Sequence, residues 1–244
     1  MKAINITNLK KAYNNVPVVD IPLLNIYQGE IVGVVGNNGA GKTTLLRLCL
    51  DLIKATKGTV SLNGTVVSKD DCWKKVTGSY LDTNFLLEFL TAKEFLYFTG
   101  EAYRLSKAEI DKRKIVFNKL MTDEITGNEK YIHELSSGNK QKVGIVSAMI
   151  IHPEILILDE PFNFLDPTSQ FELKRLLKEL NTIHKTTILV SSHNIEHIIN
   201  LSSRVILMEK GRIAKDRNND NKEVENELRR YFELFNEKEA LKNE

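Results

Sequence analysis

The 244-residue sequence predicts an α/β protein with a mostly parallel sheet, an N-terminal antiparallel β subdomain and a helical subdomain in the middle of the chain. Three observations support this prediction. Short apolar runs at residues 155–158, 187–190 and 205–208 alternate with stretches of helical spacing, which is typical of a parallel sheet buried on both faces. Residues 58–67 have the pattern of a β-hairpin. Residues 90–151 show little strand pattern and much helical spacing.

The individual elements follow from local patterns. Residues 4–12 alternate in part like a strand, and the hairpin turns at Asn63 and Gly64, which both tolerate a positive φ. The apolar, β-branched run at residues 30–35 predicts a buried strand. A helix over residues 167–183 separates two of the later strands.

A phosphate-binding loop follows the strand at residues 30–35. Residues 36–43 read Gly-Asn-Asn-Gly-Ala-Gly-Lys-Thr, which matches G-x-x-x-x-G-K-[ST], and a helical pattern comes next. In such a loop, backbone N–H groups and the positive end of the helix surround phosphate oxygens. A chance match in a glycine-rich turn is the alternative, and the flanking strand and helix argue against it. The residues expected to hold the nucleotide are Gly36, Asn37, Asn38, Gly39, Ala40, Gly41, Lys42, Thr43 and Thr44.

Two adjacent carboxylates end the apolar run at residues 155–158. Successive side chains of a strand point to opposite faces, so Asp159 and Glu160 are expected to have different roles. Asp159 fits a Mg²⁺ ligand opposite Thr43, and Glu160 fits the base that orients an attacking water. Acidic residues also cap strands without any catalytic role. Together with the phosphate loop the pair indicates a phosphate-loop NTPase, which leaves both ATPases and GTPases open.

A third motif separates these classes. Residues 135–141 read Leu-Ser-Ser-Gly-Asn-Lys-Gln and open an apolar-faced helix. Here the chain resembles the nucleotide-binding subunits of ATP-binding cassette (ABC) transporters, whose signature runs Leu-Ser-Gly-Gly-Gln. Residues 160–167 match the family's continuation from Asp-Glu-Pro to Leu-Asp, and Ser192-His193 follows the next strand as the family's switch histidine does. The resemblance covers residues 1–215, and residues 216–244 lie beyond it.

The resemblance implies ATP and Mg²⁺ as ligands and gives further residues a role. It implies that His193 contacts the γ-phosphate and that Tyr13 stacks on adenine, although a surface histidine and a packing tyrosine are the ordinary alternatives. It also implies that two subunits pair head to tail, so that each signature closes on the ATP of the other. An ordinary serine N-cap would also explain the signature serine. The remaining implied nucleotide contacts are Ser136, Ser137, Gly138, Asn139 and Asp166.

Departures from the family pattern concern hydrolysis. The family's glutamine, which contacts Mg²⁺ and the membrane subunit, is absent from residues 79–84, where Asp82 or Thr83 is the candidate substitute for binding the metal. The signature has Ser137 and Asn139 in place of glycine and glutamine. Bulky aromatic side chains, Phe162 and Phe164, replace smaller or polar residues of the family. We therefore expect a slow or partner-dependent ATPase.

Composition excludes little. The 34 Lys and Arg residues nearly balance 32 Asp and Glu residues, so no nucleic-acid partner is expected, and the two cysteines have no metal-ligand spacing. No run resembles a signal peptide or a membrane span, so we expect a soluble chain. The helical subdomain is expected at about residues 85–152. After residue 215 we expect a polar linker and then an amphipathic helix with Val224, Leu228, Tyr231 and Phe235 on one face, more often a packing face than a partner-binding one.

The leading functional hypothesis is the ATP-binding and hydrolysing subunit of a membrane transporter. Short single-cassette subunits resemble those of exporters, which implies separate transmembrane permease subunits and a position at the inner face of the cell membrane. Because the sequence contains one phosphate loop, a homodimer or a paired cassette is expected. The alternatives are a soluble ABC-family ATPase that acts on ribosomes or DNA, and a regulatory cassette that binds ATP and barely hydrolyses it.

Overall fold

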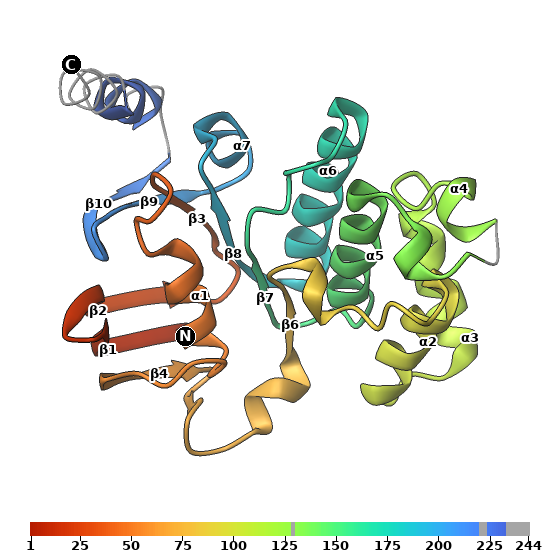
Figure 1. Cartoon of the computed structure of the whole chain (residues 1–244), viewed down its shortest axis with the longest axis horizontal. Helices are drawn as coiled ribbons and strands as arrows, with labels where there is room; N and C mark the ends of the chain where they lie inside the picture. Colours follow the sequence, from red (N-terminus) through yellow and green to blue (C-terminus); the bar gives the residue numbers. More distant parts are fainter. Residues whose placement is uncertain (128–129, 220–223, 233–244) are drawn as a thin grey trace.

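Two β-sheets and a group of helices make up the computed structural model, which describes residues 1–127, 130–219 and 224–232 (Figure 1). The strands are β1 (Lys2–Tyr13), β2 (Val16–Tyr27), β3 (Ile31–Val35), β4 (Lys57–Leu62), β5 (Thr65–Val66), β6 (Thr77–Tyr80), β7 (Ile155–Leu158), β8 (Thr187–Ser192), β9 (Arg204–Glu209) and β10 (Arg212–Asn218). The α-helices are α1 (Lys42–Cys49), α2 (Ala92–Ala102), α3 (Lys107–Lys114), α4 (Asp123–Thr126), α5 (Ser137–Ile150), α6 (Pro167–His184) and α7 (Ile195–Ile199).

The larger sheet has six strands in the order β10-β9-β3-β8-β7-β6. Its strands run parallel except for the antiparallel pair of β9 and β10. Every residue of β3, β7 and β8 is buried, as expected for strands covered on both faces. Because β3, β8, β7 and β6 are parallel neighbours, the segments that follow them meet at one edge of the sheet. This edge carries the phosphate loop and the two carboxylates.

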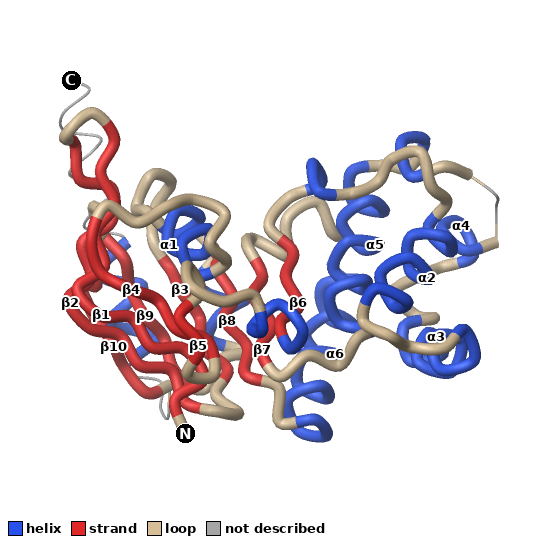
Figure 2. Tube along the Cα trace, turned by 90° about the horizontal axis from the view of Figure 1, so that it is seen from below, coloured by secondary structure: helices blue, strands red, loops and turns tan. Residues whose placement is uncertain are grey.

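The second sheet is antiparallel and has the order β2-β1-β4-β5. The predicted hairpin is confirmed: β4 and β5 pair with Leu62 opposite Thr65, and the turn residues Asn63 and Gly64 have φ of 45° and 83°. The sequence analysis did not identify β2, which pairs with β1 along most of its length. Figure 2 shows the strands of both sheets on one side of the molecule and α2 to α5 on the other.

The helical middle of the chain packs around α5. Ten consecutive residues of this helix, from Gln141 to Ile150, are buried because neighbouring helices and the sheet cover it on all sides. Helix α2 contacts α5 and begins with a capping box formed by Thr91 and Glu94. The predicted α/β fold with an antiparallel β region and a helical region is confirmed.

The expected polar linker after residue 215 is wrong for its first residues. Asp216, Arg217 and Asn218 belong to β10, where Asp216 pairs with Ile206 of β9. The Arg204 guanidinium donates two hydrogen bonds to the Asp216 carboxylate, at 2.7 and 2.6 Å, and thereby fixes this polar strand. The expected boundary at residue 215 therefore falls inside β10. Residues 224–232 are helical, and Phe235 lies outside the described residues.

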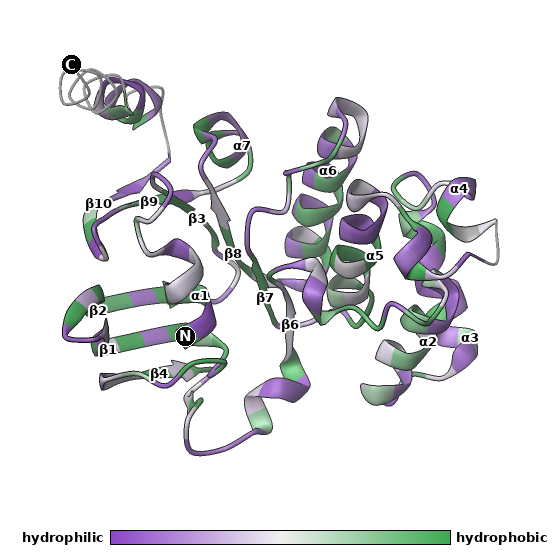
Figure 3. Cartoon of the chain, viewed as in Figure 1, coloured by the Kyte–Doolittle hydropathy of each residue, from purple (hydrophilic) through white to green (hydrophobic). Residues whose placement is uncertain are grey.

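Apolar residues gather on the inner faces of the sheets and helices (Figure 3). They form two clusters of buried side chains, one between the parallel sheet and the helical region and one between the two sheets. Within the described residues, no helix is both long enough and apolar enough to span a membrane.

Candidate active site

The phosphate loop joins β3 to α1 in a conformation that requires its glycines. Gly41, the N-cap of α1, has a φ of 100°, and Gly39 has a φ of 79°. A side chain at Gly36 would lie 2.5 Å from the carbonyl oxygen of Met208. Left-handed backbone and this close approach leave room only for glycine. The loop therefore has the tight turn that lets backbone N–H groups face an anion at the start of a helix.

Lys42 lies folded against this loop. Its side chain is 6% exposed, and its ammonium donates hydrogen bonds to the carbonyl oxygens of Gly36, at 2.7 Å, and Asn37, at 3.4 Å. The same ammonium lies 3.4 Å from a carboxylate oxygen of Glu160. The structure thus brings the positive charge of the loop next to the carboxylate that follows β7.

Ser191 of β8 holds both carboxylate residues. Its hydroxyl donates to Asp159 and accepts a hydrogen bond from the backbone N–H of Glu160 at 3.0 Å. The Asp159 carboxylate also accepts a hydrogen bond from Thr43 of α1. Burial raises the pKa of Asp159, while the hydrogen bonds from Ser191 and Thr43 oppose that shift. Ser191 was not among the predicted site residues, although its position directly before Ser192-His193 at the end of an apolar strand indicates a place in the site.

Glu160 lies between Lys42 and His193. Its second carboxylate oxygen is 2.9 Å from the imidazole Nδ1 of His193 and accepts the backbone N–H of the same residue at 3.2 Å. The backbone of Glu160 has a φ of 47°, an uncommon value for a non-glycine residue that directs its side chain towards the loop after β8. The predicted catalytic residues, Glu160 and His193, are therefore in direct contact.

The residues predicted to bind Mg²⁺ fit this ion in part. The Thr43 hydroxyl and the Asp159 carboxylate already share a hydrogen bond, and Mg²⁺ prefers such oxygen ligands with water and substrate phosphates completing the shell. Asp82 is engaged elsewhere. One of its oxygens accepts the N–H of Asn84 at 2.8 Å, and the other lies 3.5 Å from the guanidinium of Arg47.

The signature begins α5 and is joined to the segment after Glu160. The Ser136 hydroxyl caps the helix by accepting the N–H of Asn139 at 3.3 Å, while Ser136 and Ser137 are exposed. A side chain at Gly138 would lie 2.5 Å from the carbonyl oxygen of Phe164. Gln141 was not among the predicted site residues; its amide donates to the carbonyl oxygens of Pro161 and Asn163 at 2.7 Å each. These contacts fix the signature relative to residues 161–164.

Two of the remaining candidates have other contacts. Asp166 caps α6 by accepting hydrogen bonds from the N–H and the hydroxyl of Ser169, and these bonds lower the pKa of Asp166 to about 2. Tyr13, at the end of β1, is 49% exposed, and the ammonium of Lys11 lies 4.6 Å from its ring centroid. Within the described residues, no hydrogen bond or ion pair joins residues 136–139 to the phosphate loop.

Comparison with known proteins identifies this arrangement. Residues 20–163 match the family model of ABC transporters. The chain belongs to the ABC transporter family of ATP-binding subunits. The cassette is 32% identical over 240 residues to the bacitracin transport ATP-binding protein BcrA of Bacillus licheniformis, in an alignment that covers 98% of this chain and 77% of that one.

Two further similar proteins concern the direction of transport and the hydrolysis of ATP. The cassette is 32% identical over 217 residues to the sulfate/thiosulfate import ATP-binding protein CysA of Photorhabdus laumondii subsp. laumondii, covering 87% of this chain and 60% of that one. A solved dimeric ATP-binding cassette in a post-hydrolysis state, bound to ADP and Pi, aligns with a TM-score of 0.79 and 25% identity over 89% of this chain and 99% of that one. The cassette is an ATPase and the ATP-binding subunit of a transporter.

The geometry of the site fits ATP hydrolysis. Phosphoryl transfer depends mainly on positioning and electrostatic stabilisation. Lys42 places positive charge at the loop predicted to hold the phosphates, and Glu160, the predicted acceptor of a proton from the attacking water, lies next to it. His193 orients the Glu160 carboxylate through two contacts. Mg²⁺ bound by Thr43 and Asp159 would neutralise charge on the phosphate oxygens.

Proposed function

We propose that the cassette powers an exporter through ATP-driven, head-to-tail pairing of two copies. The observation that carries this proposal is the position of the signature serines. Ser136 and Ser137 are exposed at the start of a 14-residue helix, and their helix is fixed to the segment that follows Glu160. A helix N-terminus, with its unpaired N–H groups and positive dipole end, binds phosphate well. When two copies pair, the ATP bound to the second copy supplies a phosphate ligand for this helix N-terminus.

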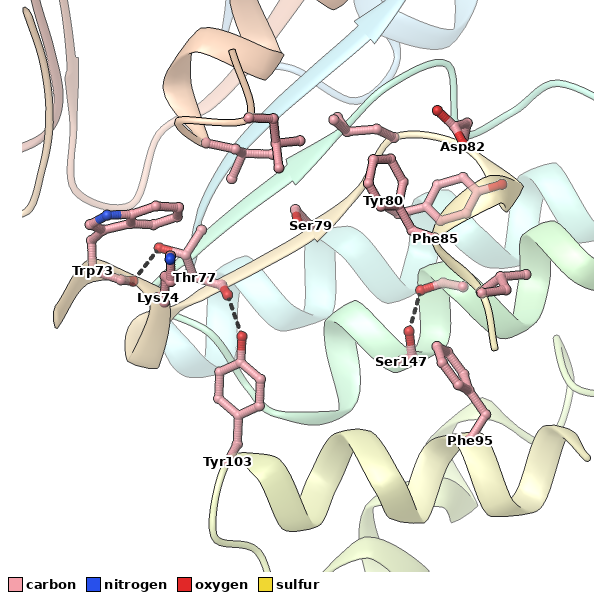
Figure 4. A pocket seen from close by; sticks show the side chains of 15 residues that line it. Trp73, Lys74, Thr77, Ser79, Tyr80, Asp82, Phe85, Phe95, Tyr103 and Ser147 are labelled. Carbon is pink, nitrogen blue, oxygen red and sulfur yellow. Dashed lines mark hydrogen bonds between the residues drawn. The ribbon is translucent and has the colours of Figure 1, made fainter. Parts of the chain in front are cut away.

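A cavity beside β6 is the proposed docking site for the permease. Its volume is about 320 Å³, and Figure 4 shows aromatic side chains around it, among them Trp73, Phe85 and Tyr103. Phe85 is 56% exposed, although most of the surrounding side chains are apolar. The hydroxyl of Tyr103 donates to the carbonyl oxygen of Thr77 at 2.9 Å, which joins α2 to β6 below the cavity. A short amphipathic segment of a permease fits a cavity with this mostly apolar lining.

Asp82 lies on the rim of the same cavity, in the segment where the family carries its glutamine. Both of its carboxylate oxygens are already engaged, by Asn84 and Arg47. Its use as a Mg²⁺ ligand therefore competes with these contacts. This supports our expectation that hydrolysis is slow or depends on the partner. Permease docking at the cavity is the event proposed to free Asp82.

Outward transport is proposed because short single-cassette subunits resemble those of exporters. The alignment with the bacitracin transport protein, whose name gives no direction, covers 98% of this chain. The alignment with the sulfate/thiosulfate import protein covers 87%. In this proposal the cassette sits at the inner face of the membrane, held there by its permease. The alternatives remain a soluble ABC-family ATPase on ribosomes or DNA and a weakly hydrolysing regulatory cassette.

The test is to tag the cassette in its native cell, solubilise the membranes gently and identify the co-purifying proteins. We expect a polytopic membrane protein in stoichiometric amount, lost in Phe85→Asp. The matched control is Phe171→Asp on α6, an exposed phenylalanine (72%, against 56% for Phe85) that does not line the cavity. Recovery with ribosomes or nucleic-acid proteins instead would contradict the transporter proposal. Transport assays in inverted and right-side-out vesicles then decide the direction.

A further inference from the structure

The helical residues 224–232 pack against the domain near the active site. In Figure 1 this segment lies close to β10 and α7. Val224 and Leu228 are buried, and Tyr231 and Phe232 pack against the same apolar cluster. Glu227 pairs with Lys215 of β10 and lies 3.7 Å from Arg217. The apolar face of this helix is therefore covered by its own domain. Other polar side chains of the helix contact segments next to the active site.

Tyr231 reaches the end of β9, where its side chain lines the same cavity as Glu209. Burial, and then interaction with the Glu209 carboxylate, raises the pKa of Tyr231 to about 12, so the hydroxyl keeps its proton and can donate to Glu209. Tyr231 and Glu209 line a small cavity of about 200 Å³ whose opposite wall is the phosphate loop at residues 37–40. Helix 224–232 thus stands beside the loop that holds the nucleotide.

The turn that Tyr231 contacts supports the phosphate loop directly. The N–H of Gly211 donates to the carbonyl oxygen of Ala40 at 2.9 Å. The carbonyl oxygen of Met208 lies so close to Gly36 that a side chain there would come within 2.5 Å of it. Residues 208–211 therefore contact both ends of the loop. A displacement of Glu209 would move these supports.

A second contact of the helix reaches the segment that carries His193. The guanidinium of Arg229 lies 3.0 Å from the carboxylate of Glu196, in the first turn of α7. The N–H of Glu196 donates to Asn194 at 2.9 Å, directly after His193. Because α7 has only five residues, an ion pair in its first turn restrains the position of the preceding histidine.

We propose that helix 224–232 positions the ATP site from two sides. Tyr231 positions the phosphate loop through Glu209, and Arg229 positions His193 through Glu196. The two residues act on different steps. The first contact bears on nucleotide affinity, because it supports the loop that binds phosphates. The second bears on turnover, because His193 orients Glu160.

The test measures the dissociation constant for a fluorescent ATP analogue and the steady-state kcat on the full chain. Tyr231→Phe, which keeps the ring and removes the hydroxyl, is expected to weaken binding about two- to five-fold at unchanged kcat, as fits the loss of one hydrogen bond. Arg229→Ala is expected to lower kcat about two- to five-fold at unchanged affinity, as fits the loss of its exposed ion pair with Glu196. Arg229 also pairs with Glu225 of the same helix at 2.8 Å, and Glu225→Ala, which removes only that pair, should leave kcat unchanged. The charge exchange Arg229→Glu with Glu196→Arg, made together with Glu225→Gln because Glu225 lies 2.8 Å from Arg229, should restore kcat.

The matched control is Arg230→Ala, because Arg230 is exposed in the same helix and makes no ion pair within the described residues. It should leave both quantities unchanged. Thermal unfolding of every variant separates positioning from folding. If Tyr231→Phe and Arg229→Ala match the control in affinity and kcat, or lose both in proportion to the folded fraction, the proposal is wrong.

Discussion

The ring of Phe162 packs against the imidazole of His197, with ring centroids 4.7 Å apart and planes inclined by 36°. Phe162 follows Glu160 by two residues, and His197 follows His193 by four. The stack is thus a second contact between the two segments that form the Glu160–His193 pair. Nδ1 of His197 is buried and has no hydrogen-bond partner in the part of the chain that the structure describes. Burial lowers the pKa of His197, so the ring is held neutral.

His197→Leu is expected to stabilise the protein at pH 7 by about 0.5–1 kcal/mol, because it removes a buried nitrogen that lacks a partner. The stack on Phe162 is replaced by an aliphatic contact of similar size. Urea unfolding of wild type and variant measures the difference. A clear loss of stability would mean that the aromatic stack outweighs the unpaired nitrogen.

Glu160→Gln is expected to lower hydrolysis at least about 100-fold while ATP binding survives, because the amide cannot accept the proton of the attacking water. The variant should accumulate as an ATP-bound dimer. Size-exclusion chromatography with saturating Mg²⁺-ATP shows the association. A variant that stays monomeric under these conditions would argue against pairing of the isolated subunit.

Lys42→Ala is expected to weaken nucleotide binding about 10- to 100-fold, since a charged hydrogen bond to phosphate is lost. Equilibrium titration with a fluorescent ATP analogue measures this. Lys142→Ala is a suitable comparison, because this equally buried lysine lies 3.6 Å from Asp166 and away from the loop. Unchanged affinity in Lys42→Ala would contradict the assignment of the loop.

Gln141→Ala is expected to destabilise the protein by about 2–3 kcal/mol, because the buried carbonyl oxygen of Pro161 and the part-buried one of Asn163 lose their donor. The signature would also lose its link to residues 161–163, so kcat should fall further than the folded fraction alone explains. Denaturant titration and kinetics on the same preparation separate the two effects. If kcat falls only in proportion to the folded fraction, Gln141 has a structural role alone.

Stability is expected to fall between pH 6.5 and about 4 because of His152. Burial, then Arg113 and His184, lowers the pKa of His152 to about 4, so below pH 6.5 the unfolded chain binds a proton that the folded chain does not. His152→Asn, at a φ of 51° that asparagine tolerates, should reduce this loss by about 1–2 kcal/mol. Urea unfolding at pH 7 and pH 5 measures it, with the exposed His133→Asn as control. An identical pH dependence in wild type and His152→Asn would count against this explanation.

The sequence predicted the parts of the fold and site that depend on local patterns. The phosphate loop, the strand before Asp159 and the hairpin at Asn63 and Gly64 are set by side chains within a few residues of one another. Spacing alone gave these elements, since periodicity and turn preference are local properties. The segment after residue 215 was predicted incorrectly. Its polar residues, such as Asp216 and Asn218, are typical of a linker, but they form a strand because they pair with β9.

The chain by itself therefore determined which residues can bind phosphate and accept a proton, because those abilities belong to the residue types and their spacing. The tertiary structure decided their contacts. Parallel pairing of β3, β8 and β7 brings Lys42, Glu160 and His193 together across more than a hundred residues of sequence. It also decided that Asp82 pairs with Arg47 and that Tyr231 meets Glu209. Such contacts depend on packing between distant segments, which no local pattern encodes.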